Sequence, residues 1–168
     1  MNELKNEKFL LDCMLGKLAR WLRFAGFDTL YFKNIDDDEL INIAIKENRI
    51  LITRDKNLYR KIIDKSIFVN ETDIDRQLYH ILKLYTANKN CYLTRCAICN
   101  TVLSTILEDP VKKCSSIKHP KTIKTFYYCT YCNKIYWNGS HSSKIINKLN
   151  NIQNDLLKKE EFVGTGKN

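Results

Sequence analysis

Residues 49–55 are Arg49-Ile50-Leu51-Ile52-Thr53-Arg54-Asp55, a short apolar run that ends in a hydroxyl, a cation and a carboxylate. An uninterrupted apolar run of this length is typical of a strand that is covered on both faces in a parallel sheet. Open parallel sheets bind ligands just beyond the carboxyl ends of their strands. The stretch therefore places Thr53, Arg54 and Asp55 at a crevice, and we interpret Asp55 as part of an acidic metal site.

A second apolar run, Phe9-Leu10-Leu11, also ends in a carboxylate, Asp12. The apolar residues between Met14 and Ala25 have helical spacing, and Gly26 favours a helix end. Further strands are expected at 29–32 and 66–70, and further helices are expected to begin near residues 36, 58 and 72. This alternation predicts an α/β fold with a short parallel sheet, ending near residues 87–90.

Composition and charge limit the function classes. The chain has 168 residues, of which 44% are hydrophobic, enough for a real core. It has no apolar run of the roughly 18 residues that span a bilayer and no apolar signal region after the polar residues 1–8. We therefore expect a cytoplasmic protein with no membrane contact, with a nuclear location as the alternative. Residues 91–141 hold seven basic and two acidic side chains, which suits a nucleic-acid partner, although solubility alone would explain them too.

Acidic side chains separated in sequence are candidates for one metal site. Asp12, one of Asp36 to Asp38, and Asp55 would surround a magnesium or manganese ion, because hard divalent cations prefer oxygen ligands. Such an ion supports phosphodiester hydrolysis by activating water. The alternative is that these acids are unrelated helix caps and turns, a common use of acids in the first turn of a helix.

Basic side chains recur every three residues in the first predicted helix, at Lys17, Arg20 and Arg23. The row begins next to Asp12, so one interpretation is that it binds substrate phosphates leading to the acidic site. The other interpretation is an ordinary solvated helix face.

Two CxxC pairs, Cys96/Cys99 and Cys129/Cys132, predict a zinc ribbon, since each pair offers two thiolates to one tetrahedral zinc ion. The long gap between the pairs predicts an inserted loop through residues 110–120. Disulfide pairing is the alternative, but it is rare in a reducing compartment. Aromatic residues and lysines alternate around the ribbon, a pattern that binds unpaired bases and backbone phosphates, although small ribbons also use such rings as their core.

Residues after Ser142 include Ile145, Leu149, Ile152 and Leu156 on one helical stripe. This predicted helix could pack back on the domain, or it could meet a partner helix, including one from a second copy of the chain. Gly164 to Asn168 are expected to be disordered.

Several separated motifs together are similar to one known family. These are FLLDCMLGKLARWLRF at 9–24, DTLYF at 28–32, DDDEL at 36–40, RILITRD at 49–55, and, in the second module, RCAICN at 95–100 and YWNGSH at 136–141. They resemble the Mut-seven carboxy-terminal ribonuclease family, whose catalytic part is a PIN-like domain. The last two match that family's RCxxCN and YWxGSH signatures.

The resemblance implies a three-layer PIN-like domain at 7–88, a zinc ribbon at 91–141, and a C-terminal helix and tail at 142–168. It implies a metal-dependent ribonuclease in which Asp12, Asp37 and Asp55 hold magnesium or manganese, with Asp38 as the alternative to Asp37. Arg20 and Arg54 match basic positions of the family and are expected to contact substrate phosphate. With the other side chains of the basic row and the strand end, Lys17, Arg23 and Thr53, they form the expected binding site for substrate RNA. Cys96, Cys99, Cys129 and Cys132 are expected to hold structural zinc. A non-catalytic RNA-binding or ribosome-associated adaptor and a toxin-like nuclease with a dedicated inhibitor stay open as alternatives.

Overall fold

The computed structural model describes residues 7–106, 123 and 125–164, with side chains as far as residue 159. The predicted inserted loop at 110–120 and the end of the predicted disordered tail lie outside the described residues. No helix in the described part is both long enough and apolar enough to cross a membrane.

The first part of the chain forms a four-stranded parallel sheet in the order β2-β1-β3-β4. Its strands are β1 (Lys8–Leu11), β2 (Asp28–Tyr31), β3 (Ile50–Thr53) and β4 (Ser66–Phe68). Between and after them lie α1 (Gly16–Phe24), α2 (Asp37–Lys46), α3 (Lys56–Lys61) and α4 (Ile74–Leu84). Single 3₁₀ turns occupy Cys13–Leu15, Ile63–Lys65 and Lys89–Cys91. The predicted α/β fold is confirmed.

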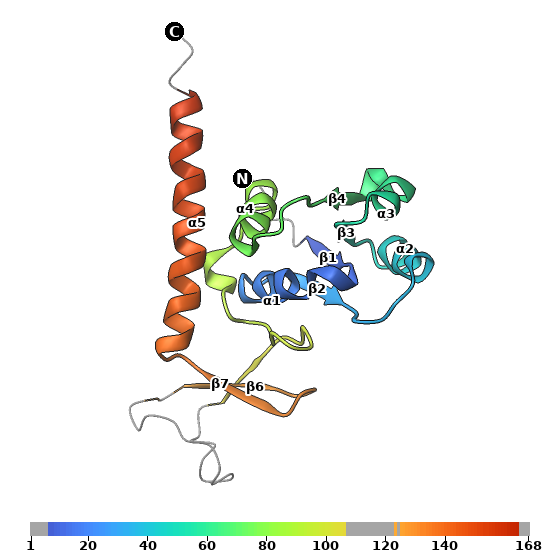
Figure 1. The fold of residues 1–168 in the computed structure, drawn as a ribbon. Coiled ribbons are helices and arrows are strands. Elements are labelled where there is room, and N and C mark those ends of the chain that lie inside the picture. The colour runs from blue at the N-terminus through green and yellow to red at the C-terminus, as the bar shows by residue number, and fades with distance from the viewer. Residues whose placement is uncertain (1–6, 107–122, 124, 165–168) are drawn as a thin grey trace.

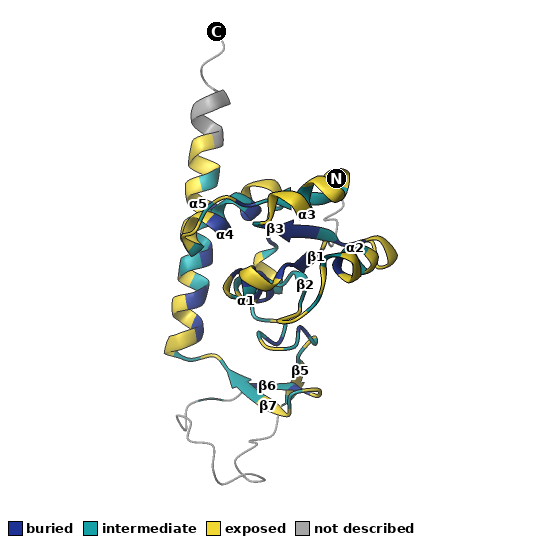
Figure 2. Ribbon diagram, turned by 45° about the vertical axis from the view of Figure 1, so that its right-hand side comes forward, coloured by how far each residue is buried: buried dark blue, intermediate teal, exposed yellow. Residues whose placement is uncertain are grey.

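Alternate residues of the central strands point into two separate cores. Phe9 and Leu11 pack with the buried faces of α1 and α4, whereas Leu10 packs with residues of α2 and α3 on the other side. Side chains alternate between the faces of a strand, so helices on both sides give three layers. Figure 2 shows β1 and β3 as the buried centre of this arrangement.

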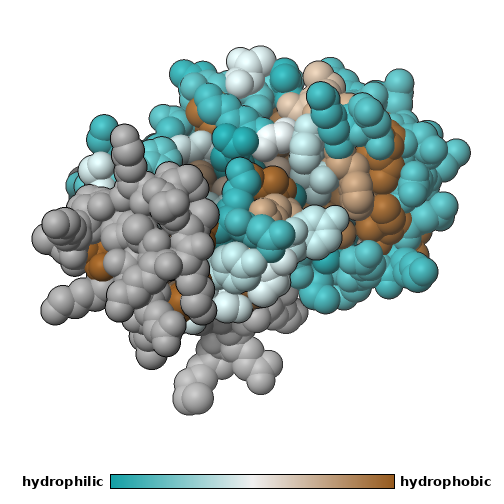
Figure 3. Space-filling model, turned by 90° about the horizontal axis from the view of Figure 1, so that it is seen from below, coloured by the Kyte–Doolittle hydropathy of each residue, from teal (hydrophilic) through white to brown (hydrophobic). Residues whose placement is uncertain are grey.

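The second module is a three-stranded antiparallel sheet in the order β5-β6-β7. Its strands are β5 (Ser104–Ile106), β6 (Phe126–Cys129) and β7 (Lys134–Trp137). It lies at one end of the molecule, and α5 (Ser140–Gly164) runs from it along the parallel-sheet domain (Figure 1). Seen from the ribbon end, the described surface is largely hydrophilic (Figure 3).

The C-terminal helix packs back on its own chain. Ile145 and Leu149 are buried in the same core as α1 and α4. Gln153 donates to the carbonyl oxygen of Ala87 (2.7 Å) and accepts from the Tyr92 hydroxyl (2.7 Å). Of the two expectations for this helix, these contacts support the intramolecular one, and none of them supports a partner helix.

Arg23 joins the two modules. It is only 4% exposed; its Nη1 donates to the carbonyl oxygens of Ala97 (3.1 Å) and Ile98 (2.7 Å), and its Nε donates to that of Thr29 (2.9 Å). The prediction that Arg23 lies on a substrate-facing row is therefore corrected. Its guanidinium is used to hold the first CxxC turn against the end of α1.

Asn100, just after that turn, makes a second link. Its Oδ1 accepts from the Thr29 amide (3.0 Å), and its Nδ2 donates to Asp28 (2.8 Å). Asp28 also forms an ion pair with the buried Arg49 (2.7 Å). Burial raises the pKa of the Asp28 carboxyl, but hydrogen bonds from Arg49 and Asn100 outweigh it and lower the pKa overall. The modules are thus joined by polar groups that satisfy one another.

Replacing Arg23 with alanine should lower the free energy of unfolding by about 3 kcal/mol, because buried carbonyl oxygens lose a charged donor. Arg20→Ala is the matched control, since Arg20 lies one turn earlier on α1 and is exposed; its effect should stay within about 0.5 kcal/mol. Urea denaturation measures both. Equal effects of the two substitutions would contradict the assigned role of Arg23.

Candidate acidic centre and metal-binding cysteines

The strand order creates a switch point between β1 and β3. From β1 the chain crosses to β2 on one side, and β3 then pairs with the other side of β1. In open parallel sheets, ligands bind where neighbouring connections diverge in this way, outside the carboxyl ends of the strands. Asp12 directly follows β1, and Thr53 is the last residue of β3. The two elements carrying the predicted site therefore meet at the expected place.

Asp12 is buried and fully oriented by its neighbours. Its Oδ1 accepts from the Met14 amide (2.6 Å), and its Oδ2 accepts from the Thr53 hydroxyl (2.7 Å) and the Arg54 amide (3.3 Å). The side chain caps the 3₁₀ turn that precedes α1 while also reaching across to the end of β3. Two strands thus fix the direction of one carboxylate.

Thr53 is a buried residue that orients both Asp12 and Asp55. It is fully buried, its hydroxyl donates to Asp12, and its Oγ1 accepts from the Asp55 amide (2.9 Å). The expectation that Thr53 binds substrate is corrected, because a side chain with no exposed surface that is bonded on both sides has no free group for RNA. Its place between the two acids gives it an orienting role.

Asp55 is exposed and caps α3. Its Oδ1 accepts from the amides of Asn57 (2.6 Å) and Leu58 (3.1 Å). Its Oδ2 makes no hydrogen bond with the described residues, so one carboxylate oxygen is available to a ligand. Capping and ligand binding, which the sequence left as alternatives, are compatible at this residue.

The acids at the start of α2 have different roles: Asp36 caps the helix, and Asp37 and Asp38 lie near a lysine. Asp36 is the cap, accepting from the Glu39 amide (2.8 Å), so Asp37 is not needed for capping. Lys61 lies 3.4 Å from Asp37 and 3.6 Å from Asp38. The Asp37 side chain is 46% exposed and that of Asp38 is 87% exposed.

The three predicted acids do not form a closed group. Among the described residues, the four ribbon cysteines are the only set of three or more possible metal ligands whose ligand atoms all lie within 4.8 Å of one another. The oxygen donors nevertheless suit a hard cation such as magnesium, which usually binds one or two carboxylates and retains several waters. Asp12 and Asp55 would hold it, with Asp37 as the third candidate.

Cationic groups occur on the segments that follow Asp12 and β3. Arg54 is half-buried, and its Nε is buried without a hydrogen-bond partner among the described residues. Lys17 and Arg20 are exposed on α1, the helix that follows Asp12. These three side chains, unlike Arg23, are free to contact an anionic ligand.

The ribbon brings Cys96, Cys99, Cys129 and Cys132 together as predicted. The sulfur atoms of Cys96 and Cys132 are 4.0 Å apart and those of Cys99 and Cys129 are 3.3 Å apart. These distances exceed a disulfide bond of about 2.05 Å. They lie near the ~3.8 Å edge of a tetrahedron with Zn–S bonds of about 2.3 Å. The four thiols could therefore hold one zinc ion.

Ionisation of the cluster depends on its neighbours. Burial raises the pKa of Cys99, but hydrogen bonding with Thr101 and with the other cysteines outweighs it and lowers the pKa to about 6. Hydrogen bonding to Cys99, together with burial, raises the pKa of Cys132 to about 12. Repulsion between four neighbouring thiolates disfavours ionisation of all four thiols, and a bound divalent cation would compensate their charge.

Tyr136 is a contact that sequence reasoning did not assign. Its hydroxyl lies 3.1 Å from the sulfur of Cys96, where it can donate to a metal-bound thiolate. Burial raises the pKa of Tyr136, so the hydroxyl stays protonated. The sequence pattern predicts that Tyr136 stacks on bases or forms part of the ribbon core, and its place in the YWNGSH motif is the only signal that points to the cysteines.

Protein purified under reducing conditions should contain about one zinc ion per chain, as four thiolates complete its sphere. Cys99→Ser should lose that zinc, whereas Cys13→Ser should retain it because Cys13 is exposed and lies outside the cluster. Elemental analysis of the three proteins measures this. Absence of zinc from the unmodified chain would contradict the assignment.

Comparisons with known proteins give one match. The family model described as the Mut7-C RNAse domain matches residues 7–149, which include both modules and the start of α5. No curated protein and no solved structure matches the chain. The matched family points to a nuclease-type hydrolase and an RNA-related function. From this match over most of its length, the chain belongs to the Mut7-C RNAse domain family.

Proposed function

We propose that this protein is a metal-dependent ribonuclease that hydrolyses phosphodiester bonds in single-stranded or loop RNA. The observation that carries the proposal is the placement of Asp12 and Asp55 at the carboxyl ends of adjacent parallel strands, at the switch point of the sheet. A ligand site is expected at that place in this class of fold. Membership of an RNase-domain family supports hydrolysis of RNA as its chemistry.

In this proposal each side chain has a separate task. Asp12, held by Thr53 and two amides, and Asp55, with one free oxygen, bind magnesium or manganese, with Asp37 as the third acid. A hard cation at such a site lowers the pKa of water and stabilises charge on a phosphodiester. The partly exposed Arg54 and the exposed Lys17 and Arg20 bind the phosphate backbone. The zinc ribbon supports the RNA beside this centre.

One observation favours a second candidate, a non-catalytic RNA-binding adaptor. Asp12 already accepts three hydrogen bonds, and Lys61 forms ion pairs with Asp37 and Asp38. Acids that are satisfied by protein groups need no cation. In that case RNA binding would persist without cleavage and without divalent metal.

Asp55→Asn should abolish magnesium- or manganese-dependent RNA cleavage while the protein stays folded. Asparagine still caps a helix, so the change removes the charge and keeps the local structure. The measurement is cleavage of a mixed pool of structured and unstructured RNAs, with each metal and with chelator.

Asp73→Asn is a matched control for this test. Asp73 caps α4 by accepting from the amides of Asp75 (3.0 Å) and Arg76 (3.1 Å), as Asp55 caps α3. Cleavage should be unchanged in Asp73→Asn. If the unmodified chain binds the RNA pool but cleaves nothing under any condition, the adaptor is the correct function.

A further inference from the structure

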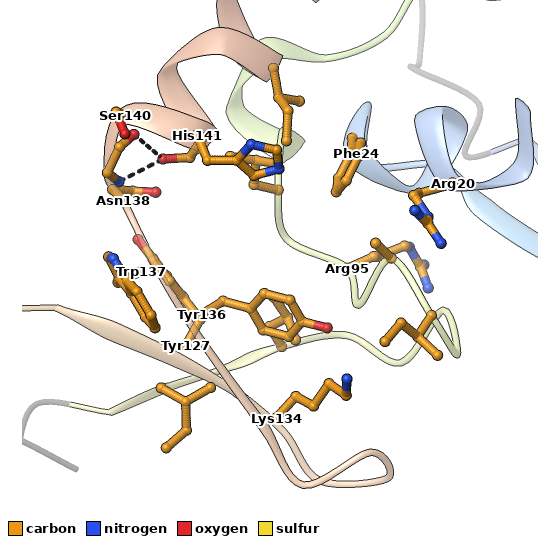
Figure 4. Close-up of a pocket in the computed structure, with 18 residues that line it drawn as sticks. Arg20, Phe24, Arg95, Tyr127, Lys134, Tyr136, Trp137, Asn138, Ser140 and His141 are labelled. Atoms are coloured by element: carbon orange, nitrogen blue, oxygen red, sulfur yellow. Dashed lines mark hydrogen bonds between the residues drawn. The ribbon is translucent and has the colours of Figure 1, made fainter. Parts of the chain in front are cut away.

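A pocket of about 540 Å³ lies between the two modules, away from the residues assigned above to the metal centre. One wall comes from α1 and carries Arg20 and Phe24. The opposite wall comes from β7 and the start of α5, and includes Tyr136, Trp137 and His141 (Figure 4). Its volume is within the range of about 300–1,000 Å³ that is common for small-ligand sites. The pocket can hold a group of the size of one nucleotide.

The charged side chains that line the pocket are all basic. Arg20, Arg95 and Lys134 line it, and no aspartate or glutamate occurs among the described residues that do so. Arg95 is partly committed, donating to the carbonyl oxygens of Gly26 (3.2 Å) and Asn100 (3.1 Å). Arg20 and Lys134 are exposed and form no ion pair with the described part of the chain. The pocket therefore favours an anion.

Contacts outside the pocket hold its aromatic wall in place. The Tyr136 hydroxyl lies 3.1 Å from the sulfur of Cys96, so the cysteine cluster holds this ring. Gly139 and Ser142 close the turn after Trp137 by two hydrogen bonds of 2.7 Å, drawn as dashed lines in Figure 4. Rings that are fixed before binding lose little entropy when a base packs on them. The YWNGSH motif thus shapes the pocket as well as supporting zinc.

We propose that this pocket binds one unpaired nucleotide of an RNA strand, at a site distinct from the acidic centre. Its base would pack among Tyr136, Trp137 and His141, and its flanking phosphates would contact Arg20 and Lys134. Aromatic rings beside cations are the combination that holds single strands, since every base has a face to stack and every linkage a charge. The inference rests on the proposed RNA substrate but not on its cleavage.

A strand rather than a free mononucleotide fits the position of the pocket. Arg20 in its wall and Asp12 in the acidic centre are joined by the 3₁₀ turn Cys13–Leu15 and the first residues of α1, a rise of roughly 14 Å at ~2.0 Å per 3₁₀ residue and ~1.5 Å per α-helical residue. The exposed Lys17 lies on the same helix between them. A strand seated in the pocket can thus continue along α1 to the acids, and the pocket would set which linkage reaches them.

The test measures binding of a fluorescent eight-nucleotide oligouridylate to the zinc-loaded chain without magnesium or manganese. Removing one phosphate contact lowers the slope of log K against log salt by about 0.7, which is roughly an eightfold loss at about 50 mM salt. Lys134→Ala and Arg20→Ala, from opposite walls, should each show this loss. Lys158→Ala, an exposed lysine on α5 outside the pocket, should show none.

Photocrosslinking with 4-thiouridine in the same oligonucleotide locates the strand. Crosslinks should map to the peptide that contains Trp137 and His141. Crosslinks confined to the acidic centre, or equal affinities for Lys134→Ala and Lys158→Ala, would overturn the pocket assignment even if the protein cleaves RNA. Pocket crosslinks in a protein that cleaves nothing would keep this inference and reject the nuclease.

Discussion

The pairing of β1 with β3 is the constraint on which the candidate site depends. Leu11 lies opposite Ile52 in the parallel register, and the Asp12 amide continues the ladder by donating to the Ile52 carbonyl oxygen (3.1 Å). The backbone of Asp12 is therefore held to β3 independently of its side chain. The Thr53 hydroxyl then adds a buried hydrogen bond to the carboxylate. A shift of register would turn Thr53 to the other face and separate the two acids.

The second module depends on the same strand ends through α1. This helix follows the 3₁₀ turn that Asp12 caps, and it ends against the first CxxC turn, where Arg23 donates to the carbonyl oxygens of Ala97 and Ile98. The turn is closed by the cysteine cluster, and Leu93 donates to the carbonyl oxygen of Phe24 (2.8 Å) at the same junction. The cysteine cluster and α1 are thus joined by direct hydrogen bonds. The residues matched by the family model, 7–149, include this junction.

Periodicity and local motifs predicted most of the fold, because apolar runs, helical spacing and CxxC pairs are local signals. The predicted substrate-binding roles of Arg23 and Thr53 were wrong because each side chain is buried against other parts of the chain. Each residue of a helix turns by about 100°, so side chains three residues apart fall about 60° short of a full turn. Over the six residues from Lys17 to Arg23 this offset doubles to about 120°, and Arg23 faces the ribbon. The role of Thr53 depends on Asp12, a residue 41 positions earlier, and Arg23 contacts carbonyl groups 74 and 75 positions later. Nothing in the local sequence specifies such partners.

We propose that carboxylates at the ends of β1 and β3 bind one hard cation. The most direct measurement is paramagnetic broadening of amide signals when manganese is added to the zinc-loaded, isotopically labelled protein. We expect selective loss of the signals of Met14, Arg54 and Asn57, whose amides donate to Asp12 or Asp55. Uniform weak broadening, or selective broadening only elsewhere, would contradict a metal centre at this sheet edge.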